Sequence, residues 1–182
     1  MSSFSMEASI LTFSVIFFSY LLGSIPFGIL VSKVFGLGNL RDIGSGNIGA
    51  TNVLRTGNKL AALITLILDG LKGVLAVVVA RFISEVAAIT ASIFVIIGHI
   101  YPVWLRFSGG KGVATFIGAI LALNFVTGLL VCFIWIIIAL IFRYSSISAI
   151  VSSASAPIGV FLFYDNEALV VTLFMTVLIW YR

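Results

Sequence analysis

Two glycine-rich segments carry the residues whose types and spacing fit the binding of phosphate groups. The first segment runs from Gly36 to Asn52, has five glycines between Gly36 and Gly49, and is followed by Arg55. Glycines let successive backbone N–H groups converge on an anion, and a helix that begins directly afterwards adds a favourable dipole. A surface loop with helix-capping residues explains the same pattern, so the residues alone leave both interpretations open. The candidate ligands here are Ser45, Gly46, Asn47, Gly49, Thr51, Asn52 and Arg55.

The second segment is the turn Gly109-Gly110-Lys111-Gly112, which precedes another apolar stretch with Thr115 in its first turn. Lys111 fits a phosphate or carboxylate ligand, and it fits equally well a lysine that anchors the cytoplasmic face of a membrane protein. Pro102 is expected to end or kink the helix before this turn. The only histidine, His99, could be a general base. We favour a structural hydrogen bond for it, and keep His99, Gly109 and Gly110 as candidate substrate contacts.

Asp69 and Lys72 lie one helical turn apart inside an apolar stretch. Ionisable groups at membrane depth are costly, and this spacing lets the two side chains pair. We therefore predict a structural ion pair that faces the interior of a helix bundle, in preference to a direct chemical role. Gly70 and Gly73 predict close helix packing beside it. The hydroxyls between Arg143 and Ser148 either join the site or cap a helix.

The composition indicates a membrane protein. Of the 182 residues, 62% are hydrophobic and 9% are charged, whereas soluble domains carry about 25% charged residues. The net charge of +4 is therefore interpreted as a topology signal and not as a nucleic-acid surface. Cys132 is the single cysteine, which excludes a disulfide framework or a cysteine-based metal motif. The leader Met1–Ser9 has no basic residue, so we expect a retained first helix.

Seven apolar segments predict an all-α bundle of about seven transmembrane helices. Their ranges are 8–31, 60–80, 86–105, 113–124, 127–142, 146–163 and 167–181. The uncharged stretch from Gly112 to Phe142 would be about 45 Å long as one helix, so we predict a break near Asn124–Gly128. The basic residues of the loops then segregate eight to one, which places the N-terminus outside and the C-terminus inside. The predicted cytoplasmic residues are Lys33, Arg41, Arg55, Lys59, Arg106, Lys111, Arg143 and Arg182, and the predicted outer ones are Glu7, Arg81, Glu85, Asp165 and Glu167.

Five short motifs, in this order, closely resemble the bacterial membrane acyl-phosphate:glycerol-3-phosphate acyltransferases. They are Gly23-Ser-Ile-Pro-Phe-Gly28, Gly44-Ser-Gly-Asn-Ile-Gly-Ala-Thr-Asn52, Leu68-Asp-Gly-Leu-Lys-Gly73, Gly98-His-Ile-Tyr-Pro-Val103 and Gly109-Gly-Lys-Gly-Val-Ala-Thr115. The likeness runs from about residue 15 to the last residue. It implies transfer of a fatty acyl group from acyl phosphate to the 1-hydroxyl of glycerol 3-phosphate, giving lysophosphatidic acid and phosphate. It implies no metal and no other cofactor.

The resemblance also implies one acyltransferase domain over residues 1–182, in the bacterial inner membrane, with its site facing the cytoplasm. Its expected partners are acyl phosphate, glycerol 3-phosphate and membrane lipid, and nucleic acid is not among them. Carried over by position, the phosphate-holding loop is Ser45, Gly46, Asn47, Gly49 and Thr51, and Arg55 and Lys111 contact glycerol phosphate. The implied catalytic residues are Ser45, Asn47, Arg55 and Lys111.

The sequence departs from the family in two places. The family's serine after the Arg-Tyr pair aligns with Ala149, so Ser148 is expected to stand in for it. In the family, a segment rich in His, Arg and Asn follows the final Tyr-Arg and contacts glycerol phosphate, whereas this sequence ends at Arg182. We therefore expect a fragment, or a variant whose acceptor site is damaged and whose activity is reduced.

Two other classes of function remain open. A small transporter or channel for a phosphorylated or anionic solute explains the helices, the broken segments and the Asp69–Lys72 pair. Transporter sites tend to lie at mid-membrane, however, whereas the glycine motifs are expected on one face. A membrane scaffold is the third class, and it predicts no particular effect from losing Asn47 or Lys111.

Overall fold

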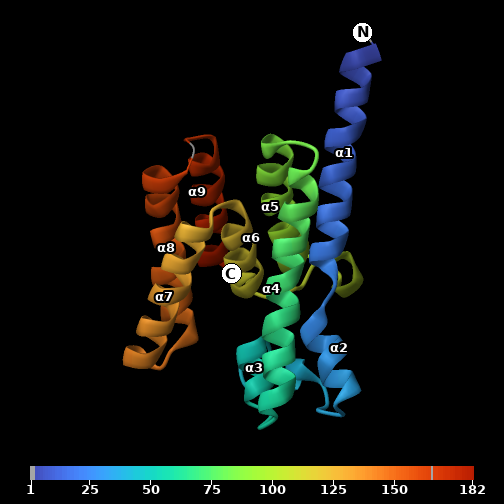
Figure 1. Cartoon of the computed structure of the whole chain (residues 1–182). Helices are drawn as coiled ribbons and strands as arrows, with labels where there is room; N and C mark the ends of the chain where they lie inside the picture. Colours follow the sequence, from blue (N-terminus) through green and yellow to red (C-terminus); the bar gives the residue numbers. More distant parts are fainter. Residues whose placement is uncertain (1–2, 165) are drawn as a thin grey trace.

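The computed structural model describes residues 3–164 and 166–182, and every regular element within them is helical. The elements are α1 (Ser3–Ser24), α2 (Phe27–Val34), η1 (Leu40–Asp42), α3 (Ala50–Leu54), α4 (Lys59–Arg81), α5 (Glu85–Ile100), η2 (Val103–Leu105), α6 (Val113–Leu123), α7 (Phe125–Phe142), α8 (Ser145–Phe163) and α9 (Asn166–Tyr181). The long helices run alongside one another, and the first part of α1 extends beyond the rest of the bundle (Figure 1).

Five helical stretches are long and apolar enough to cross a bilayer. They are Glu7–Val34, Lys59–Arg81, Glu85–Leu105, Phe125–Phe142 and Ser145–Phe163. The two remaining apolar helices, Val113–Leu123 and Ala168–Tyr181, are shorter. All seven predicted segments are thus helical and the all-α class is confirmed, while the number of membrane crossings stays a prediction.

Asparagine and serine side chains start several of the long helices. Asn58 accepts a hydrogen bond from the Ala61 N–H at 3.0 Å, and Ser84 accepts one from the Ala87 N–H at 3.0 Å. Asn124 accepts one from the Thr127 N–H at 2.8 Å. Such caps satisfy N–H groups that have no partner within the helix. The cap at Asn124 lies between α6 and α7, so the break that the sequence predicted there is confirmed.

The first predicted helix, 8–31, is wrong as a single element. It divides at Ile25–Pro26 into α1 and α2, because proline lacks an N–H and its ring clashes with the preceding turn. At this break the Ile25 carbonyl accepts from the Phe27 N–H at 3.1 Å and from the Lys72 ammonium at 2.9 Å. Pro102 acts as predicted, since α5 ends at Ile100.

The interior between α4, α5 and α6 confirms the predicted ion pair. The Lys72 ammonium lies 2.8 Å from the Asp69 carboxylate, and both side chains are buried. The His99 Nδ1 atom lies 3.5 Å from the same carboxylate and 3.2 Å from the Thr115 hydroxyl. The predicted close packing is also present, because a Cβ added at Gly73 would lie 2.2 Å from the Thr115 carbonyl oxygen of α6.

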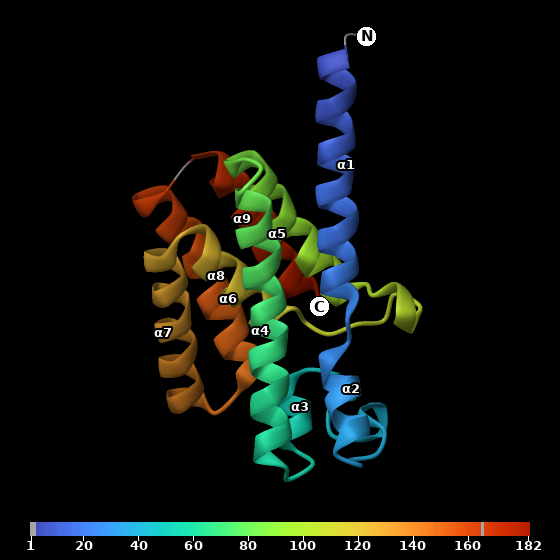
Figure 2. The same ribbon diagram turned by 45° about the vertical axis from the view of Figure 1, so that its right-hand side comes forward.

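The connections gather at two ends of the bundle. We call the end that holds α2, α3, the start of α4 and the α7–α8 connection the loop end (Figures 1 and 2). We include in it the α5–α6 connection, which runs out to the side past the junction of α1 and α2 in Figure 2 and is bonded to Arg41 through Ser108. The opposite end holds the α4–α5, α6–α7 and α8–α9 connections. Of the residues predicted outside, Asp165 and the side chain of Glu167 lie outside the part of the chain that is described.

Candidate active site

The glycine loop before α3 is shaped by one buried amide side chain. The Asn52 amide donates to the Leu40 carbonyl at 2.9 Å, and its oxygen accepts from the Ser45 N–H at 3.1 Å. The backbone turns through Gly44 at φ +53° and Gly46 at φ +68°, a conformation that glycine adopts without strain. Asn52 therefore holds the loop together from inside, and its predicted contact with substrate stays a prediction.

The helix that follows the loop is shorter than the phosphate-binding pattern requires. Gly49 precedes α3, and α3 spans only five residues before Arg55. A helix of little more than one turn contributes little dipole. A helix does begin directly after the loop, as predicted, but it is so short that an anion at this loop would depend mainly on the loop and on nearby cations.

Arg55 reaches from the end of α3 to a cleft of about 330 Å³ between α3 and the α7–α8 connection. Its side chain lies against Gly44, where an added Cβ would come within 2.5 Å of the arginine Cδ. The cleft is lined by Thr51, Leu54, Arg55, Arg143, Tyr144, Ser145 and Ser146. The sequence left open whether the hydroxyls between Arg143 and Ser148 join the site. In the structure, the predicted site residues Thr51 and Arg55 share the cleft with the first residues of this segment.

Lys111 is hydrogen-bonded to the side of the cleft that the start of α8 forms. Its ammonium donates to the Ser146 hydroxyl at 2.8 Å, across the gap between the α5–α6 connection and α8. The turn that carries it packs on His99, because a Cβ added at Gly110 would lie 2.3 Å from the His99 Nε2 atom. His99 is buried between Asp69 and this turn, and its contact with the Thr115 hydroxyl fits the structural hydrogen bond that the sequence analysis favoured. Its predicted contact with substrate stays a prediction.

Arg41 joins the two glycine segments. Its guanidinium donates to the Gly46 carbonyl at 3.2 Å and to the Ser108 carbonyl in the α5–α6 connection. Asn39 holds the start of η1 by accepting from the Arg41 N–H at 3.1 Å. The loop of Ser45 and Asn47 and the turn of Lys111 are thus connected through one side chain, which the sequence had marked only as a topology residue.

The serines of the α7–α8 connection differ from the expectation. Ser148 is buried and donates to the Tyr144 carbonyl of its own helix at 3.0 Å, so it does not reach the cleft. Ser146 takes the position beside Lys111 instead. Both serines belong to the same polar run, so the sequence could not tell which one reaches the cleft. The direction in which each side chain points from the first turn of α8 decides it.

The charges around the cleft are uncompensated. Within residues 3–164 and 166–182, no ion pair joins a carboxylate to Arg55, Lys111 or Arg143. The lining offers hydroxyls and guanidinium groups, which donate hydrogen bonds to phosphate oxygens with added strength from the charge. The arrangement can hold and neutralise anions.

Within residues 3–164 and 166–182, no group of three or more His, Cys, Asp or Glu side chains converges. The expectation of a metal-free reaction stays a prediction.

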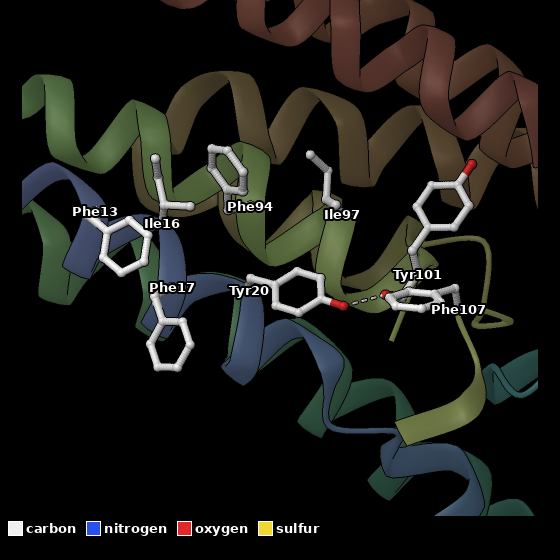
Figure 3. A pocket seen from close by; sticks show the side chains of 8 residues that line it. All are labelled: Phe13, Ile16, Phe17, Tyr20, Phe94, Ile97, Tyr101 and Phe107. Atoms are coloured by element: carbon white, nitrogen blue, oxygen red, sulfur yellow. Dashed lines mark hydrogen bonds between the residues drawn. The ribbon is translucent and has the colours of Figure 1, made fainter. Parts of the chain in front are cut away.

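A larger hollow of about 450 Å³ lies between α1, α5 and the α5–α6 connection. Phe13, Phe17, Phe94 and Phe107 point into it, and the Tyr20 hydroxyl donates to the Tyr101 carbonyl at 2.8 Å (Figure 3). No charged residue lines this hollow. It can take hydrocarbon but not a phosphate group, so the cationic cleft remains the candidate site.

The sequence profile of the glycerol-3-phosphate acyltransferase family matches residues 13–182. The chain belongs to this family. A glycerol-3-phosphate acyltransferase of Roseobacter denitrificans is 57% identical over 164 residues, which cover 90% of this chain and 82% of the relative. One of Dinoroseobacter shibae is 54% identical over 165 residues, covering 90% of this chain and 81% of the relative. The resemblance inferred from the five motifs is confirmed.

Two solved structures of PlsY, an integral membrane glycerol 3-phosphate acyltransferase, share the fold. The glycerol 3-phosphate form matches with a TM-score of 0.88 at 36% identity, over 94% of this chain and 87% of PlsY. The lysophosphatidic acid form matches with a TM-score of 0.86 at 35% identity, over the same shares of 94% and 87%. With its five candidate spans, the chain is a multi-pass, all-helical membrane protein.

Proposed function

We propose that this protein transfers a fatty acyl group from acyl phosphate to the 1-hydroxyl of glycerol 3-phosphate, which forms lysophosphatidic acid and inorganic phosphate for phospholipid synthesis. The observation that carries the proposal is that Arg55 and Arg143 line one cleft and Lys111 is bonded to its lining residue Ser146, with no carboxylate paired to any of the three among the described residues. Glycerol 3-phosphate is a phosphate monoester and acyl phosphate is a mixed anhydride, so each brings a phosphate anion that such cations can hold. Membership of the family and the two forms of PlsY support glycerol 3-phosphate as the acceptor and lysophosphatidic acid as the product.

The chemistry requires positioning more than it requires a protein nucleophile. The C1 hydroxyl oxygen of glycerol 3-phosphate attacks the acyl carbonyl carbon, and the bond from that carbon to the phosphoryl oxygen breaks. The electron pair leaves with the phosphate, which takes up the hydroxyl proton. The cleft lining contains no histidine or carboxylate that could act as a base. In this proposal Ser45, Asn47, Arg55 and Lys111 bind the two anions and stabilise the charge on the departing phosphate.

The proposal places the loop end at the cytoplasmic face of the bacterial inner membrane and treats residues 1–182 as one domain. The elements of the loop end, with the residue after α9, carry all eight of the basic residues that the sequence assigned to the inside. The opposite end carries Arg81, which is paired with Glu85. Basic residues favour the cytoplasmic side of membrane proteins.

The test is phosphate release by the purified chain in lipid vesicles, given palmitoyl phosphate with and without glycerol 3-phosphate. Release that depends on the acceptor, with lysophosphatidic acid as the co-product, is the expected result. Asn47→Ala should abolish most of it, because Asn47 lies in the glycine loop and its side-chain oxygen accepts from the Ile48 N–H at 2.8 Å. Ser155→Ala serves as the control, because the Ser155 hydroxyl donates only within α8, to the Ser152 carbonyl at 2.7 Å.

A second version of the protein carries, after Arg182, the segment that follows the matching position in a family member. Comparing the two versions distinguishes an incomplete acceptor site from a wrong assignment of the reaction. Acceptor-dependent release that appears only in the extended version would mean that the reaction is assigned correctly and the acceptor site needs that segment. No release from either version would refute the proposal. A transporter or scaffold would likewise show no acceptor-dependent release.

A further inference from the structure

The turn that carries Lys111 is bonded through its backbone to the end of α5. The Gly109 N–H donates to the Ile100 carbonyl at 3.0 Å, and the Gly110 N–H donates to the His99 carbonyl at 3.2 Å. The last carbonyls of a helix have no partner within that helix, so these bonds satisfy both groups. A Cβ added at Gly109 would lie 2.1 Å from the His99 carbonyl oxygen. The backbone before Lys111 therefore lies directly on the last turn of α5.

The imidazole ring of His99 lies on the interior side of the same turn. Its Nε2 atom faces Gly110, where an added Cβ would lie 2.3 Å away. Its Nδ1 atom lies 3.2 Å from the hydroxyl of Thr115, in the first turn of α6. Gly110 precedes Lys111 in the sequence and Thr115 follows it. The ring thus contacts the chain on both sides of Lys111, and it is buried.

The buried ion pair holds the ring from the other side. The His99 Nδ1 atom lies 3.5 Å from the Asp69 carboxylate, and the Lys72 ammonium lies 2.8 Å from that carboxylate. All three side chains are buried. Removing charges from water offsets much of what their attraction gains, so stability alone is a weak reason for such a cluster. Its contacts do, however, give the ring a fixed position in the interior.

Lys111 needs this support because its own segment is flexible. A lysine ammonium lies at the end of a flexible four-carbon stem, so its position depends on where the backbone is held. Three of the four residues from Gly109 to Gly112 are glycines, which lack the side chain that restricts a backbone. The Lys111 ammonium nevertheless reaches the hydroxyl of Ser146, a residue that lines the cationic cleft. The contacts with α5 explain how the turn keeps this position.

We propose that His99 is a positioning residue for the acyl transfer. Its ring, held by the buried ion pair, fixes the turn so that the Lys111 ammonium stays beside Ser146 and can bind the phosphate of glycerol 3-phosphate. The inference rests on the proposed function, in which Lys111 binds a phosphate anion. It gives His99 a role through Lys111, with no contact to substrate and no proton transfer.

The experiment is a double-mutant cycle between His99→Ala and Lys111→Ala, measured as acceptor-dependent phosphate release in phosphatidylcholine vesicles. His99→Ala alone should lower kcat/KM for glycerol 3-phosphate about tenfold, through a rise in KM, because it weakens a hydrogen bond from a charged group. KM for palmitoyl phosphate should stay unchanged. In the Lys111→Ala background, the same change should lower kcat/KM less than about twofold, because no ammonium is left to position.

Ser92→Ala is the control for losing a buried polar side chain from α5. The Ser92 hydroxyl donates within its own helix, to the Ile89 carbonyl at 2.6 Å, and Ser92 is buried two turns before His99. The variant should leave both KM values unchanged. An equal rise in KM for glycerol 3-phosphate in Ser92→Ala and His99→Ala would overturn the inference, because any disturbance of α5 would then have the same effect.

Gly110→Ala tests the contact with the ring from the side of the turn. Gly110 is outside the left-handed region, so its backbone accepts alanine and the added Cβ meets only the His99 ring. The variant should raise KM for glycerol 3-phosphate as His99→Ala does. In the His99→Ala protein the ring is gone, so Gly110→Ala should cause less than about twofold further loss. If His99→Ala does not fold, His99→Asn replaces it, because asparagine keeps a polar atom for Thr115 and removes the outer part of the ring.

A second measurement is independent of activity. The rate at which acetic anhydride acetylates Lys111, relative to the exposed Lys33 of the same molecule, should rise in His99→Ala as the amine loses its place beside Ser146. An unchanged ratio would overturn the inference. An equal loss of kcat/KM from His99→Ala with and without Lys111 would also overturn it, since His99 would then act independently. If the wild type showed no acceptor-dependent release, the proposed function would fail, and the acetylation ratio would still decide whether His99 positions Lys111.

Discussion

The two ends of the bundle use arginine in opposite ways. At the opposite end, Arg81 pairs with the Glu85 carboxylate at 2.9 Å and donates to the carbonyls of Ala122 and Leu123. The Tyr164 hydroxyl contacts both Glu85 and Arg81. One guanidinium thus joins α4, α5, α6 and α8. At the loop end, Arg55 and Arg143 line a cleft and no carboxylate neutralises them among the described residues.

This difference teaches how a structural cation can be told from a functional one. Arg81 has its charge and its N–H groups satisfied by the protein, so the folded state gains from it and a further ligand would find nothing to bind. Cations that share a cleft repel one another and gain only when an anion enters. The stability of the opposite end and the anion affinity of the loop end are therefore expected to respond separately to mutation.

The largest effect is expected from Lys111→Ala. It should lower kcat/KM about 10²–10³-fold, the usual cost of removing a group that stabilises charge in a transition state. Thermal unfolding of the protein in detergent should barely change, because Lys111 is held by a single side-chain hydrogen bond to Ser146. The measurement is acceptor-dependent phosphate release alongside a melting curve.

Lys33→Ala is the control for this variant. Lys33 is exposed in the last turn of α2, at the same end of the bundle but outside the cleft. The Lys33→Ala variant should keep near-wild-type activity, because the reaction depends on the cations at the cleft and not on the overall positive charge of the loop end. An equal loss in both variants would mean that the loop end acts only through its overall charge.

Arg81→Ala should produce the reverse pattern. We expect a loss of about 2 kcal/mol in stability, because a charged hydrogen-bonding group is removed while its half-exposed ion pair is partly screened by water. The activity of each folded molecule should stay the same. Glu85→Gln, which keeps the shape of the partner, should lose less stability. A fall in kcat/KM of the folded fraction would show that the two ends are coupled and that the contrast between them is wrong.

Local signals predicted much of the fold. The apolar runs predicted the helices, and the spacing of Asp69 and Lys72 predicted the buried ion pair. The length of the uncharged stretch and the segregation of the basic residues predicted the break near Asn124, where the structure shows the Asn124 cap of α7. The apolar run across Pro26 concealed the division of the first helix, because hydrophobicity continues on both sides of the proline. Five motifs in order identified the family that the comparisons confirm.

The site could be predicted only in part, because its contacts join distant segments. Arg55 and Lys111 were found through their motifs, but the Lys111–Ser146 bond spans 35 residues and the Arg41–Ser108 bond spans 67. Neither contact has a periodic or compositional signal. The first joins the α5–α6 connection to the start of α8, and the second joins η1 to the α5–α6 connection. The order of the helices alone determines neither meeting.

A smaller effect at the loop end is expected from Ser146→Ala. Losing its bond with the Lys111 ammonium should lower kcat/KM about fivefold, in line with about 1 kcal/mol for one hydrogen bond. Ser146→Thr should restore most of the activity, because it returns the hydroxyl. Ser155→Ala is the control, since the Ser155 hydroxyl donates only within α8, to the Ser152 carbonyl at 2.7 Å. A Thr variant as impaired as the Ala variant would show that packing, and not the bond to Lys111, explains the loss.

Tyr164→Phe should give the smallest effect and the finest test of the contrast between the two ends. It removes the hydroxyl that contacts Glu85 and Arg81 but leaves their ion pair and the carbonyl bonds of Arg81 in place. The expected loss is about 0.5 kcal/mol in stability, the low end for one hydrogen bond, because Arg81 and Glu85 keep their other partners. The measurement is a melting curve together with KM for both substrates. Both KM values should stay constant, since the reaction needs only that α8 keeps Ser146 beside Lys111. A change in either KM would mean that the position of α8 at one end controls the cleft at the other, and the opposite end would then be part of the catalytic design.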